Sequence, residues 1–327
     1  TNPSRIDVQA SIEITKLLYR FAPQEAIHQY SVDEVWVTVD GLEKLFGTRW
    51  QIAEKIKRAI ENELGLPSAI GIGDNKFLAK VVLDLHAKRA ENGIAECKYE
   101  DVPRLLWPFP VEKIWGIGSR LKRHLHRLGI TTLGQLASFP LNQLKERFGI
   151  MGEQLYWHAW GVDLSPVFGN FLKQEQKSFG HGISLLRDYN AEEVPAVLLD
   201  LCEETCRRAR TAKQVGRTIH LSVRYSKKTG SGFSRSTSIE IPTNITMEMY
   251  KICLYLFRTH YDGSSKIRKV SVALTNLTED EKTQLDLFTK RTKQKDLGYT
   301  MDLIRERFGA DALLRATSYT EAGINLE

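Results

Sequence analysis

Hydrophobic and polar residues follow two different periods in the first 110 residues, which predicts that helices and strands alternate there. Apolar residues at helical spacing indicate amphipathic helices, and short β-branched and aromatic runs are typical of strands. The expected elements are a helix at 9–22, a strand at 35–39, a helix at 48–64, a strand at 67–73 and a helix from Asn75 to about Arg89. This order is that of half a split βαβ sandwich.

The pattern changes twice further along the chain. Residues 111–166 are helical, and residues 165–176 have no periodicity and are typical of a linker. A second α/β region follows, with strands at 177–189, 217–225, 233–241 and 267–275 and helices at 192–213 and 246–260. Its order is β-α-β-β-α-β. The tail, 278–327, is charged at first and helical at 299–309. We therefore predict a multidomain α+β protein.

Composition narrows the class of protein. A chain of 327 residues is long enough for two or three domains, and 42% hydrophobic residues is typical of a globular protein. No apolar run approaches the roughly 20 residues that span a bilayer, so we expect no membrane association. Cys202 and Cys206 lie four residues apart on a helical pattern, with no further Cys or His at zinc-site spacing. We expect both in the core of a cytoplasmic protein.

The net charge of +6 is modest, but basic residues concentrate in one stretch without any acidic residue. Such a stretch is typical of a nucleic-acid surface, and a solvated basic face is nearly as good an interpretation when the stretch is considered alone. Its members are Arg207, Arg208, Arg210, Lys213, Arg217, Arg224, Lys227, Lys228 and Arg235.

Two adjacent carboxylates, Asp33 and Glu34, precede the apolar strand at 35–39. At a turn both can reach one point, and burying both is costly unless cations neutralise them. Magnesium prefers oxygen ligands and combines few protein carboxylates with substrate phosphates. The pair therefore predicts a metal-dependent phosphoryl-transfer site. The alternative, a surface turn with two solvated acids, is disfavoured by the apolar residues that follow.

Two lysines lie on the helix predicted after the strand at 67–73. Lys80 and Lys88 are eight residues apart and so close to one helical face. A lysine that faces the carboxylates is able to hold a triphosphate as a point charge. Taken singly, each is more simply an exposed lysine.

The segment Trp115-Gly116-Ile117-Gly118-Ser119 predicts a glycine-flanked turn between helices. Such a turn frees backbone N–H groups to bind phosphate at the N-terminus of the next helix. It is typical of helix-hairpin-helix units that bind DNA irrespective of sequence. The alternative is a tight turn that needs glycine for close helix packing.

A further short motif lies in the charged tail. The segment Gln284-Leu285-Asp286-Leu287-Phe288 places apolar anchors in a solvated stretch, as does a peptide that binds a partner's groove. Five-residue patterns also arise by chance, so the motif alone is a weak indication.

Together these motifs resemble the Y-family translesion DNA polymerases of the bacterial branch. YSVDEVWVTVDG resembles the Ser-x-Asp-Glu hairpin of the palm, GIGDNKFLAKVVLDLHAK its second palm helix, and WGIGSRLKRHLHRLGI the thumb hairpin; QLDLF resembles the clamp-binding motif. The resemblance implies a partial palm at 1–110, a helix-hairpin-helix thumb at 111–166, a linker at 167–176, a little-finger domain at 177–277 and a tail with the clamp motif at 278–327.

The resemblance implies roles for the acidic and basic residues of the palm. Asp33 is expected to bridge two Mg²⁺ ions, and Glu34 to bind the ion that activates the primer 3′-hydroxyl. Lys88 is expected to contact the incoming deoxynucleoside triphosphate. The segment from Asp84 to Arg89 has one residue more than the family's Asp-Leu-x-Lys-Pro-Asn-Gly and lacks its proline, which puts the role of Lys88 in question.

The resemblance also implies partners, with primer–template DNA and a sliding clamp as the macromolecules. The chain is expected to act as a monomer, associated with the nucleoid in the cytoplasm. Duplex phosphates would be held by Gly116, Gly118 and Ser119, and the little finger would grip DNA through Arg217, Arg224 and Arg235. The clamp would bind Gln284, Leu285, Leu287 and Phe288.

The chain departs from the family at its start. The family has an N-terminal palm strand with a further metal-binding aspartate and then a fingers subdomain, whereas this chain opens at Thr1 in the helix before the hairpin. Two-metal catalysis needs enough carboxylates to hold ions roughly 3.5–4 Å apart. We therefore expect little or no polymerase activity from residues 1–327 alone.

Two rival functions remain open at this point. A non-catalytic DNA-binding adaptor would use the helix-hairpin-helix and the clamp peptide, but it would need neither Asp33 nor Glu34. A nuclease would use the same carboxylates, but it would not explain the paired α/β regions or the clamp peptide. We rank polymerase first, adaptor second and nuclease third.

Overall fold

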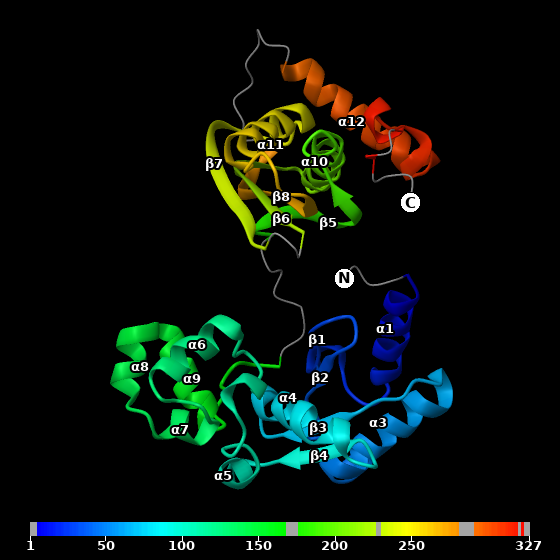
Figure 1. Ribbon diagram of the computed structural model, residues 1–327. Helices are drawn as coiled ribbons and strands as arrows, with labels where there is room; N and C mark the ends of the chain where they lie inside the picture. Colours follow the sequence, from blue (N-terminus) through cyan, green and yellow to red (C-terminus); the bar gives the residue numbers. More distant parts are fainter. Residues whose placement is uncertain (1–4, 168–175, 227–229, 281–290, 320–321, 324–327) are drawn as a thin grey trace. The chain divides into compact units, whose positions relative to one another are not determined.

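A computed structural model describes the chain except for residues 1–4, 168–175, 227–229, 281–290, 320–321 and 324–327 (Figure 1). The chain forms two compact units, residues 1–174 and 175–327. Each unit has its own hydrophobic core, and each is described by itself below.

The first unit consists of helices and two small sheets. Its strands are β1 (Ile27–Gln29), β2 (Val35–Val37), β3 (Ile70–Gly73) and β4 (Ile94–Cys97). Its helices are α1 (Arg5–Leu18), α2 (Glu43–Phe46), α3 (Arg49–Leu64), α4 (Lys76–Leu85), α5 (Val102–Leu105), α6 (Ser119–Arg127), α7 (Leu133–Ser138), α8 (Leu141–Phe148) and α9 (Ile150–Ala159). Short 3₁₀ turns occupy residues 24–26, 87–89, 99–101 and 111–113.

Local sequence explains where α3 begins and ends. The Thr48 hydroxyl accepts a hydrogen bond from the Gln51 backbone N–H while the Gln51 side chain binds back, which is a capping box. Gly65 ends the helix in the left-handed region at φ +67°, which a residue with a side chain rarely adopts. The apolar face of α3 packs with α1 and the β1–β2 hairpin.

The βαβ unit of this region is β3–α4–β4, whose strands pair in parallel. Two glycines of β3 let α4 lie directly against the strand. A Cβ on Gly71 would lie 2.1 Å from the Ala79 carbonyl oxygen, and one on Gly73 would lie 2.4 Å from the Ala79 nitrogen. This close approach fixes the position of the helix that carries Lys80.

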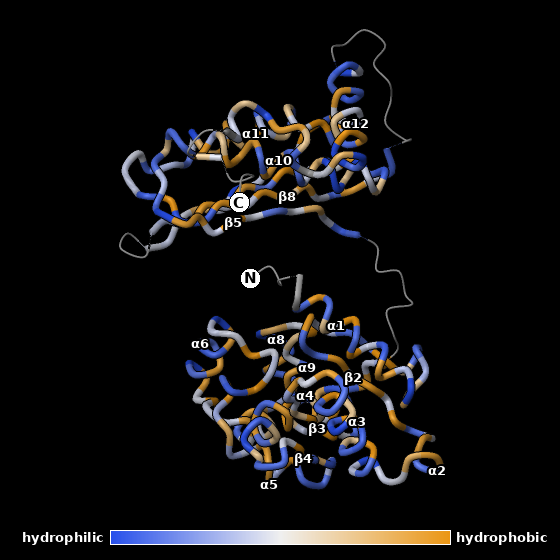
Figure 2. Tube along the Cα trace, turned by 90° about the vertical axis from the view of Figure 1, so that its right-hand side faces the viewer, coloured by the Kyte–Doolittle hydropathy of each residue, from blue (hydrophilic) through white to orange (hydrophobic). Residues whose placement is uncertain are grey.

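The second unit is a four-stranded antiparallel sheet with two helices on one face (Figure 1). Its elements are β5 (Ser178–Tyr189), α10 (Val194–Thr211), β6 (Gln214–Tyr225), β7 (Gly232–Thr243), α11 (Thr246–His260) and β8 (Ile267–Glu279). The strand order is β5-β8-β6-β7, and the orange stretches of α10, α11 and β8 in Figure 2 belong to the core between helices and sheet. The predicted β-α-β-β-α-β order is confirmed.

A further helix, α12 (Arg291–Phe308), follows the sheet and packs on α10, with 3₁₀ turns at 310–312 and 316–319. Several predicted boundaries are wrong, and α1, for example, spans Arg5–Leu18 rather than 9–22. The tail helix begins at Arg291 rather than near residue 299, and α4 ends at Leu85 rather than near Arg89. His86 leaves the helical conformation at φ −123°, and its ring contacts Phe109 and the Leu105 carbonyl. Strand β4 was not predicted.

Candidate functional site

The predicted carboxylate pair lies on the tight turn between β1 and β2. The backbone N–H groups of Tyr30 and Ser31 both donate to the Glu34 carbonyl, at 3.0 and 3.1 Å, and close the turn. The Ser31 hydroxyl donates to the Asp33 carboxylate at 2.6 Å. This hydrogen bond is the main reason that the pKa of Asp33 lies below its ordinary value. Asp33 is exposed and ionised at neutral pH.

Glu34 belongs to a closed ring of alternating charges, which we call the carboxylate–lysine ring and which consists of Glu34, Lys80, Asp84 and Lys88. Lys80 Nζ lies 2.5 Å from Glu34 Oε1 and 3.0 Å from Asp84 Oδ2. Lys88 Nζ lies 2.7 Å from Asp84 Oδ1 and 3.9 Å from Glu34 Oε1. The structure thus brings both predicted lysines to the carboxylates, although Lys88 lies on a 3₁₀ turn beyond α4.

Burial and pairing act in opposite directions on the ionisation of this ring. Burial disfavours the charged form of Lys80, but its hydrogen bonds to Glu34 and Asp84 outweigh burial and raise its pKa. Burial likewise works against ionised Asp84, but the two lysines hold its pKa below the ordinary value. Asp84 is a member of the site that the sequence did not single out. Its spacing of four residues from each lysine was the available indication.

The chemistry of the turn is compatible with a magnesium ion. Asp33 and Glu34, adjacent on the turn, supply hard oxygen ligands, and magnesium usually combines one or two protein carboxylates with substrate phosphates. Over the part of the chain that the structure describes, no group of three or more His, Cys, Asp and Glu side chains is placed to hold a metal. The turn therefore fits a magnesium ion that takes two protein carboxylates and completes its coordination with other ligands, such as substrate phosphates.

An aromatic cluster joins this turn to the predicted phosphate-binding turn. The ring of Tyr30 lies 4.7 Å from that of Trp36 and 5.8 Å from that of Trp115, measured between centroids. The Trp115 indole N–H donates to the Tyr30 hydroxyl at 3.2 Å. Since Trp115 directly precedes Gly116, the cluster fixes the glycine turn relative to Asp33 and Glu34.

The glycine turn itself is open rather than tightly packed. A Cβ on Gly116 or on Gly118 would meet no atom within 4 Å, so close helix packing does not explain either glycine. Gly116 adopts φ +91°, which favours glycine for conformational reasons. Gly118 is the N-cap of α6 and has no capping side chain, which leaves the first N–H groups of the helix, from Ser119 on, available to a ligand.

The second unit offers a different kind of surface on the face of its sheet that the helices do not cover, which we call the open face. Strand register aligns side chains in four rows across β5, β8, β6 and β7. The rows are Ser178, Thr275, Thr218 and Ser238; Gly180, Ala273, His220 and Ser236; Gly182, Ser271, Ser222 and Ser234; and Ser184, Lys269, Arg224 and Gly232. These positions carry small or hydroxyl side chains, one histidine (His220), two basic residues at one end and no carboxylate.

The register separates the three arginines predicted to grip DNA. Arg224 lies on the open face, beside Lys269. Arg235 pairs with Leu221, a core residue, so its side chain points to the helix side of the sheet at the edge strand β7. Arg217 is exposed and lies where the register between β6 and β7 shifts. The structure therefore places Arg224 and Arg235 on opposite faces.

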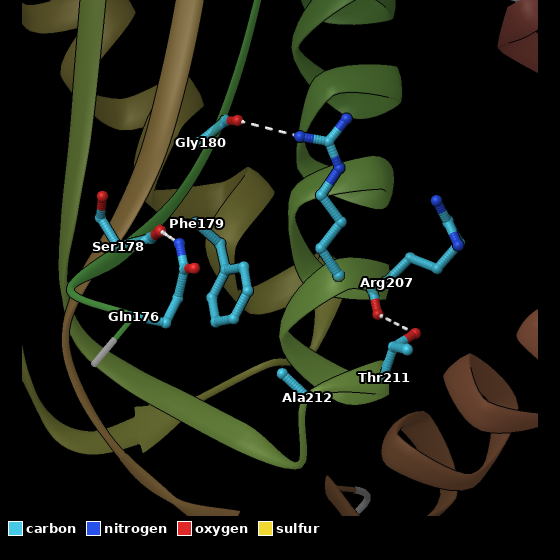
Figure 3. A pocket seen from close by; sticks show the side chains of 8 residues that line it. Gln176, Ser178, Phe179, Gly180, Arg207, Thr211 and Ala212 are labelled. Carbon is cyan, nitrogen blue, oxygen red and sulfur yellow. Dashed lines mark hydrogen bonds between the residues drawn. The ribbon is translucent and has the colours of Figure 1, made fainter. Parts of the chain in front are cut away.

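Part of the basic stretch is paired with a carboxylate at the surface of the second unit. A pocket of about 670 Å³ opens between the start of β5 and the end of α10 (Figure 3). Arg207 and Arg208 line it, and both bind Glu204, at 2.8 and 2.7 Å. The remaining lining residues are Gln176, Ser178, Phe179, Gly180, Thr211 and Ala212. One carboxylate thus offsets part of the charge that the sequence assigned to a nucleic-acid surface.

For Arg210 the prediction of a nucleic-acid contact is wrong. Its side chain is 1% exposed and binds the Asp302 carboxylate through two nitrogens, at 2.6 and 3.0 Å. The partner lies 92 residues further along the chain, on α12, and covers the arginine. The charge pattern within positions 207–235 could not reveal it.

The remaining predictions have simpler outcomes. Cys202 and Cys206 are buried in the core of the second unit, as expected, and burial raises the pKa of Cys206 to about 12. The proposed clamp motif, 284–288, lies outside the described residues, as does most of the predicted linker. Of the helices that the structure describes, none combines the length and the apolarity needed to cross a bilayer.

Sequence comparisons agree with this arrangement. The model of the impB/mucB/samB family matches residues 6–84, its helix-hairpin-helix motif residues 99–130, and its C-terminal domain residues 176–287. The UV-damage repair protein UvrX of Bacillus subtilis is 48% identical over 331 residues, which cover 100% of this chain and 78% of UvrX. DNA polymerase IV 2 of the same organism is 42% identical, covering 97% of this chain and 76% of the relative.

Among solved structures, a Y-family DNA polymerase chimera has the same fold. It superposes with a TM-score of 0.64 at 23% identity, covering 85% of this chain and 78% of the chimera. Identity of 48% across the whole chain, together with three matching family regions in order, is decisive for the family. The chain belongs to the bacterial branch of the Y family of DNA-directed translesion DNA polymerases.

Proposed function

We propose that the protein works in magnesium-dependent nucleotidyl transfer to a primer 3′-hydroxyl on damaged template DNA. One observation carries the proposal: the turn with Asp33 and Glu34 is fixed to the phosphate-binding glycine turn through Trp115 and Tyr30. A polymerase needs its metal ligands at a set place relative to the duplex, whereas an adaptor has no use for that link.

In this proposal Asp33 and Glu34 hold magnesium, which neutralises phosphate charge and activates the attacking hydroxyl. Lys88 binds the triphosphate of the incoming nucleotide. The side chain of Lys88 is 51% exposed and its Nζ lies 2.7 Å from Asp84, so it is held near the carboxylates with its amine accessible to solvent. The reaction is attack of the 3′-oxygen on the α-phosphorus with release of pyrophosphate.

DNA binding is assigned to two surfaces. Gly116, Gly118 and Ser119 present backbone N–H groups to one phosphate, and the open face of the second unit takes another part of the backbone. Small side chains allow a phosphodiester chain to approach the sheet, and hydroxyl groups are common phosphate donors. Arg224 and Lys269 add charge at one end. Neither surface reads base edges, so binding should be nearly independent of sequence.

Primer extension tests the catalytic part. The assay is run with four nucleotides over a magnesium series, on residues 1–327 and on a longer chain that includes the family's N-terminal palm strand and fingers. Extension that requires magnesium and is abolished by Asp33→Asn supports the proposal. A longer chain that binds primer–template but never extends it favours the adaptor. The same assay tests the prediction that residues 1–327 alone have little or no activity.

Salt dependence tests the DNA-binding part, with a matched control on the opposite face. Arg224→Ala should reduce the slope of log K against log salt by about 1, because one phosphate contact is lost. Arg235→Ala removes the same charge from the helix side of the sheet and should leave the slope unchanged. Equal effects of both variants would show that only total charge matters and not the open face.

The clamp motif stays a proposal from sequence alone. Leu287→Ala combined with Phe288→Ala should abolish binding of the chain to a bacterial sliding clamp in a gel-filtration assay, because the apolar anchors of the peptide are removed. Primer–template affinity serves as the control and should not change. Sedimentation of the free chain in the same series tests the expectation of a monomer.

A further inference from the structure

Lys80 differs from Lys88 in its surroundings. Its side chain is 8% exposed, against 51% for Lys88. It projects from α4, which the glycines of β3 hold against the strand, and its helical neighbours Phe77 and Val81 are buried in the core. A buried ammonium is costly unless it is paired, so the position of Lys80 Nζ is determined by the two carboxylates that bind it.

These two carboxylates connect different parts of the proposed reaction. Glu34 is a proposed metal ligand, and Asp84 holds Lys88, the proposed triphosphate ligand. Both lysines contact the same oxygen of Glu34, Oε1, at 2.5 and 3.9 Å. We therefore assign the second oxygen of Glu34, Oε2, to the cation.

We propose that Lys80 is a positioning residue, which orients Glu34 toward the metal and, through Asp84, holds Lys88 at the site. This inference rests on the proposed metal-binding role of Asp33 and Glu34. Groups that orient metal ligands usually matter for metal affinity even though they do not touch the ion. Lys80 is the hydrogen-bond donor that orients the Glu34 carboxylate in this protein.

Simple electrostatics predicts the opposite of this proposal. Lys80 is a cation next to a cation site, so its removal should strengthen metal binding if charge alone mattered. Loss of the orienting contact should weaken binding instead, because Glu34 is then free to leave the geometry in which Oε2 faces the ion. The sign of the change therefore distinguishes positioning from charge repulsion.

Terbium luminescence measures this change without requiring activity. Tb³⁺ is a hard, oxygen-seeking ion, and Trp36, two residues from Glu34, is placed to sensitise its emission. Lys80→Met keeps the apolar stem and should raise the Tb³⁺ concentration at half-saturation about tenfold. Lys76→Met is the matched control, because Lys76 Nζ lies 5.7 Å from the Trp36 ring but is not part of the carboxylate–lysine ring. It should leave the midpoint unchanged or lower it.

Further variants separate the possible failures. If Asp33→Asn and Glu34→Gln leave the luminescence titration unchanged, the proposed metal site itself is wrong. If they abolish it while Lys80→Met binds Tb³⁺ as tightly as or more tightly than the parent chain, only the positioning role is wrong. Lys80→Arg, which retains a donor to Oε1, should restore most of the affinity. Far-UV circular dichroism of each variant verifies folding, and a midpoint raised tenfold in a folded Lys80→Met chain supports positioning.

Discussion

Two charged clusters of similar composition have opposite surroundings in this molecule. The carboxylate–lysine ring of the first unit is open to solvent on the side of Lys88, which is 51% exposed. The second cluster, which we call the α12 latch, consists of Glu203, Arg210, Asp302, Arg305 and Arg315. Its central pair is nearly inaccessible, with Arg210 at 1% and Glu203 at 7% exposure.

The comparison shows that partner and burial, rather than charge, decide what an ionic group does. In the α12 latch all five N–H donors of the Arg210 guanidinium are used, so none is left for DNA; the acceptors are Asp302, Glu203, the Asn244 carbonyl and the Thr246 hydroxyl. In the carboxylate–lysine ring the lysine amine of Lys88 has one close partner and remains accessible. The α12 latch therefore stabilises the fold, whereas the carboxylate–lysine ring keeps one amine accessible to solvent.

The largest effect is expected from Arg210→Met. Removal of one partner from a buried ionic network leaves uncompensated carboxylates and typically costs about 3–5 kcal/mol. All six tryptophans lie in residues 1–174, so urea unfolding followed by tryptophan fluorescence should be unchanged, while the transition seen by circular dichroism splits. Arg208→Met, which removes an exposed partner of Glu204, should cost no more than about 1 kcal/mol. A fluorescence shift in Arg210→Met would contradict the separation of the two units.

A smaller loss is expected in the carboxylate–lysine ring. Lys80→Met should lower the free energy of unfolding by about 2 kcal/mol, because Glu34 and Asp84 lose a hydrogen-bonded partner but can still reach water and Lys88. Here the loss should appear in tryptophan fluorescence. A cost as large as that of Arg210→Met would mean that the ring is as deeply structural as the α12 latch.

The sequence was sufficient to predict the elements whose cause is local. The β-α-β-β-α-β order, the Asn75 cap and the turn with Asp33 and Glu34 each depend on periodicity or capping within a few residues. Residues of the carboxylate–lysine ring on α4 and its following turn are spaced by four, so the ring was partly foreseeable.

What the sequence could not predict depends on contacts between distant segments. The burial of Arg210 is caused by Asp302 on α12, and the side chain of Arg235 points away from Arg224 because of strand register rather than because of its neighbours. The link between Trp115 and Tyr30 joins residues 85 positions apart. Charge counting along the chain cannot distinguish a surface arginine from one that a later helix covers.

Acid should weaken the contact between α12 and the sheet through protonation of Asp280. Asp280 accepts hydrogen bonds from Lys295 and Tyr299 at 2.6 and 2.8 Å. Burial opposes the ionisation of Asp280, but these partners hold its pKa below the ordinary value. A carboxylate whose pKa is lower in the folded state than in the unfolded state stabilises the fold at any pH above the unfolded-state pKa. This contribution is lost as the pH falls through the folded-state pKa.

Asp280→Asn therefore tests that contribution by its pH dependence. The variant should be less stable than the parent chain at pH 7, by about 1 kcal/mol, and the difference should vanish as the pH falls below the folded pKa. Circular dichroism melts from pH 7 down to pH 2 provide the measurement, because the folded pKa of Asp280 lies below its ordinary value. A difference that persists unchanged at the acid end would assign the effect to packing of the side chain instead of its charge.

The smallest effect on stability is expected at the most important proposed ligand. Asp33 is exposed and accepts a hydrogen bond from the Ser31 hydroxyl at 2.6 Å, which the amide oxygen of asparagine can also accept. Asp33→Asn should therefore change the free energy of unfolding by less than about 0.5 kcal/mol while abolishing the sensitised Tb³⁺ signal. Asp33→Asn would then remove ion binding without a loss of stability, whereas Arg210→Met affects stability alone. A destabilisation equal to that of Lys80→Met would instead show that the Asp33 carboxylate contributes to the stability of the fold. The contrast between the open carboxylate–lysine ring and the buried α12 latch would then not hold for Asp33.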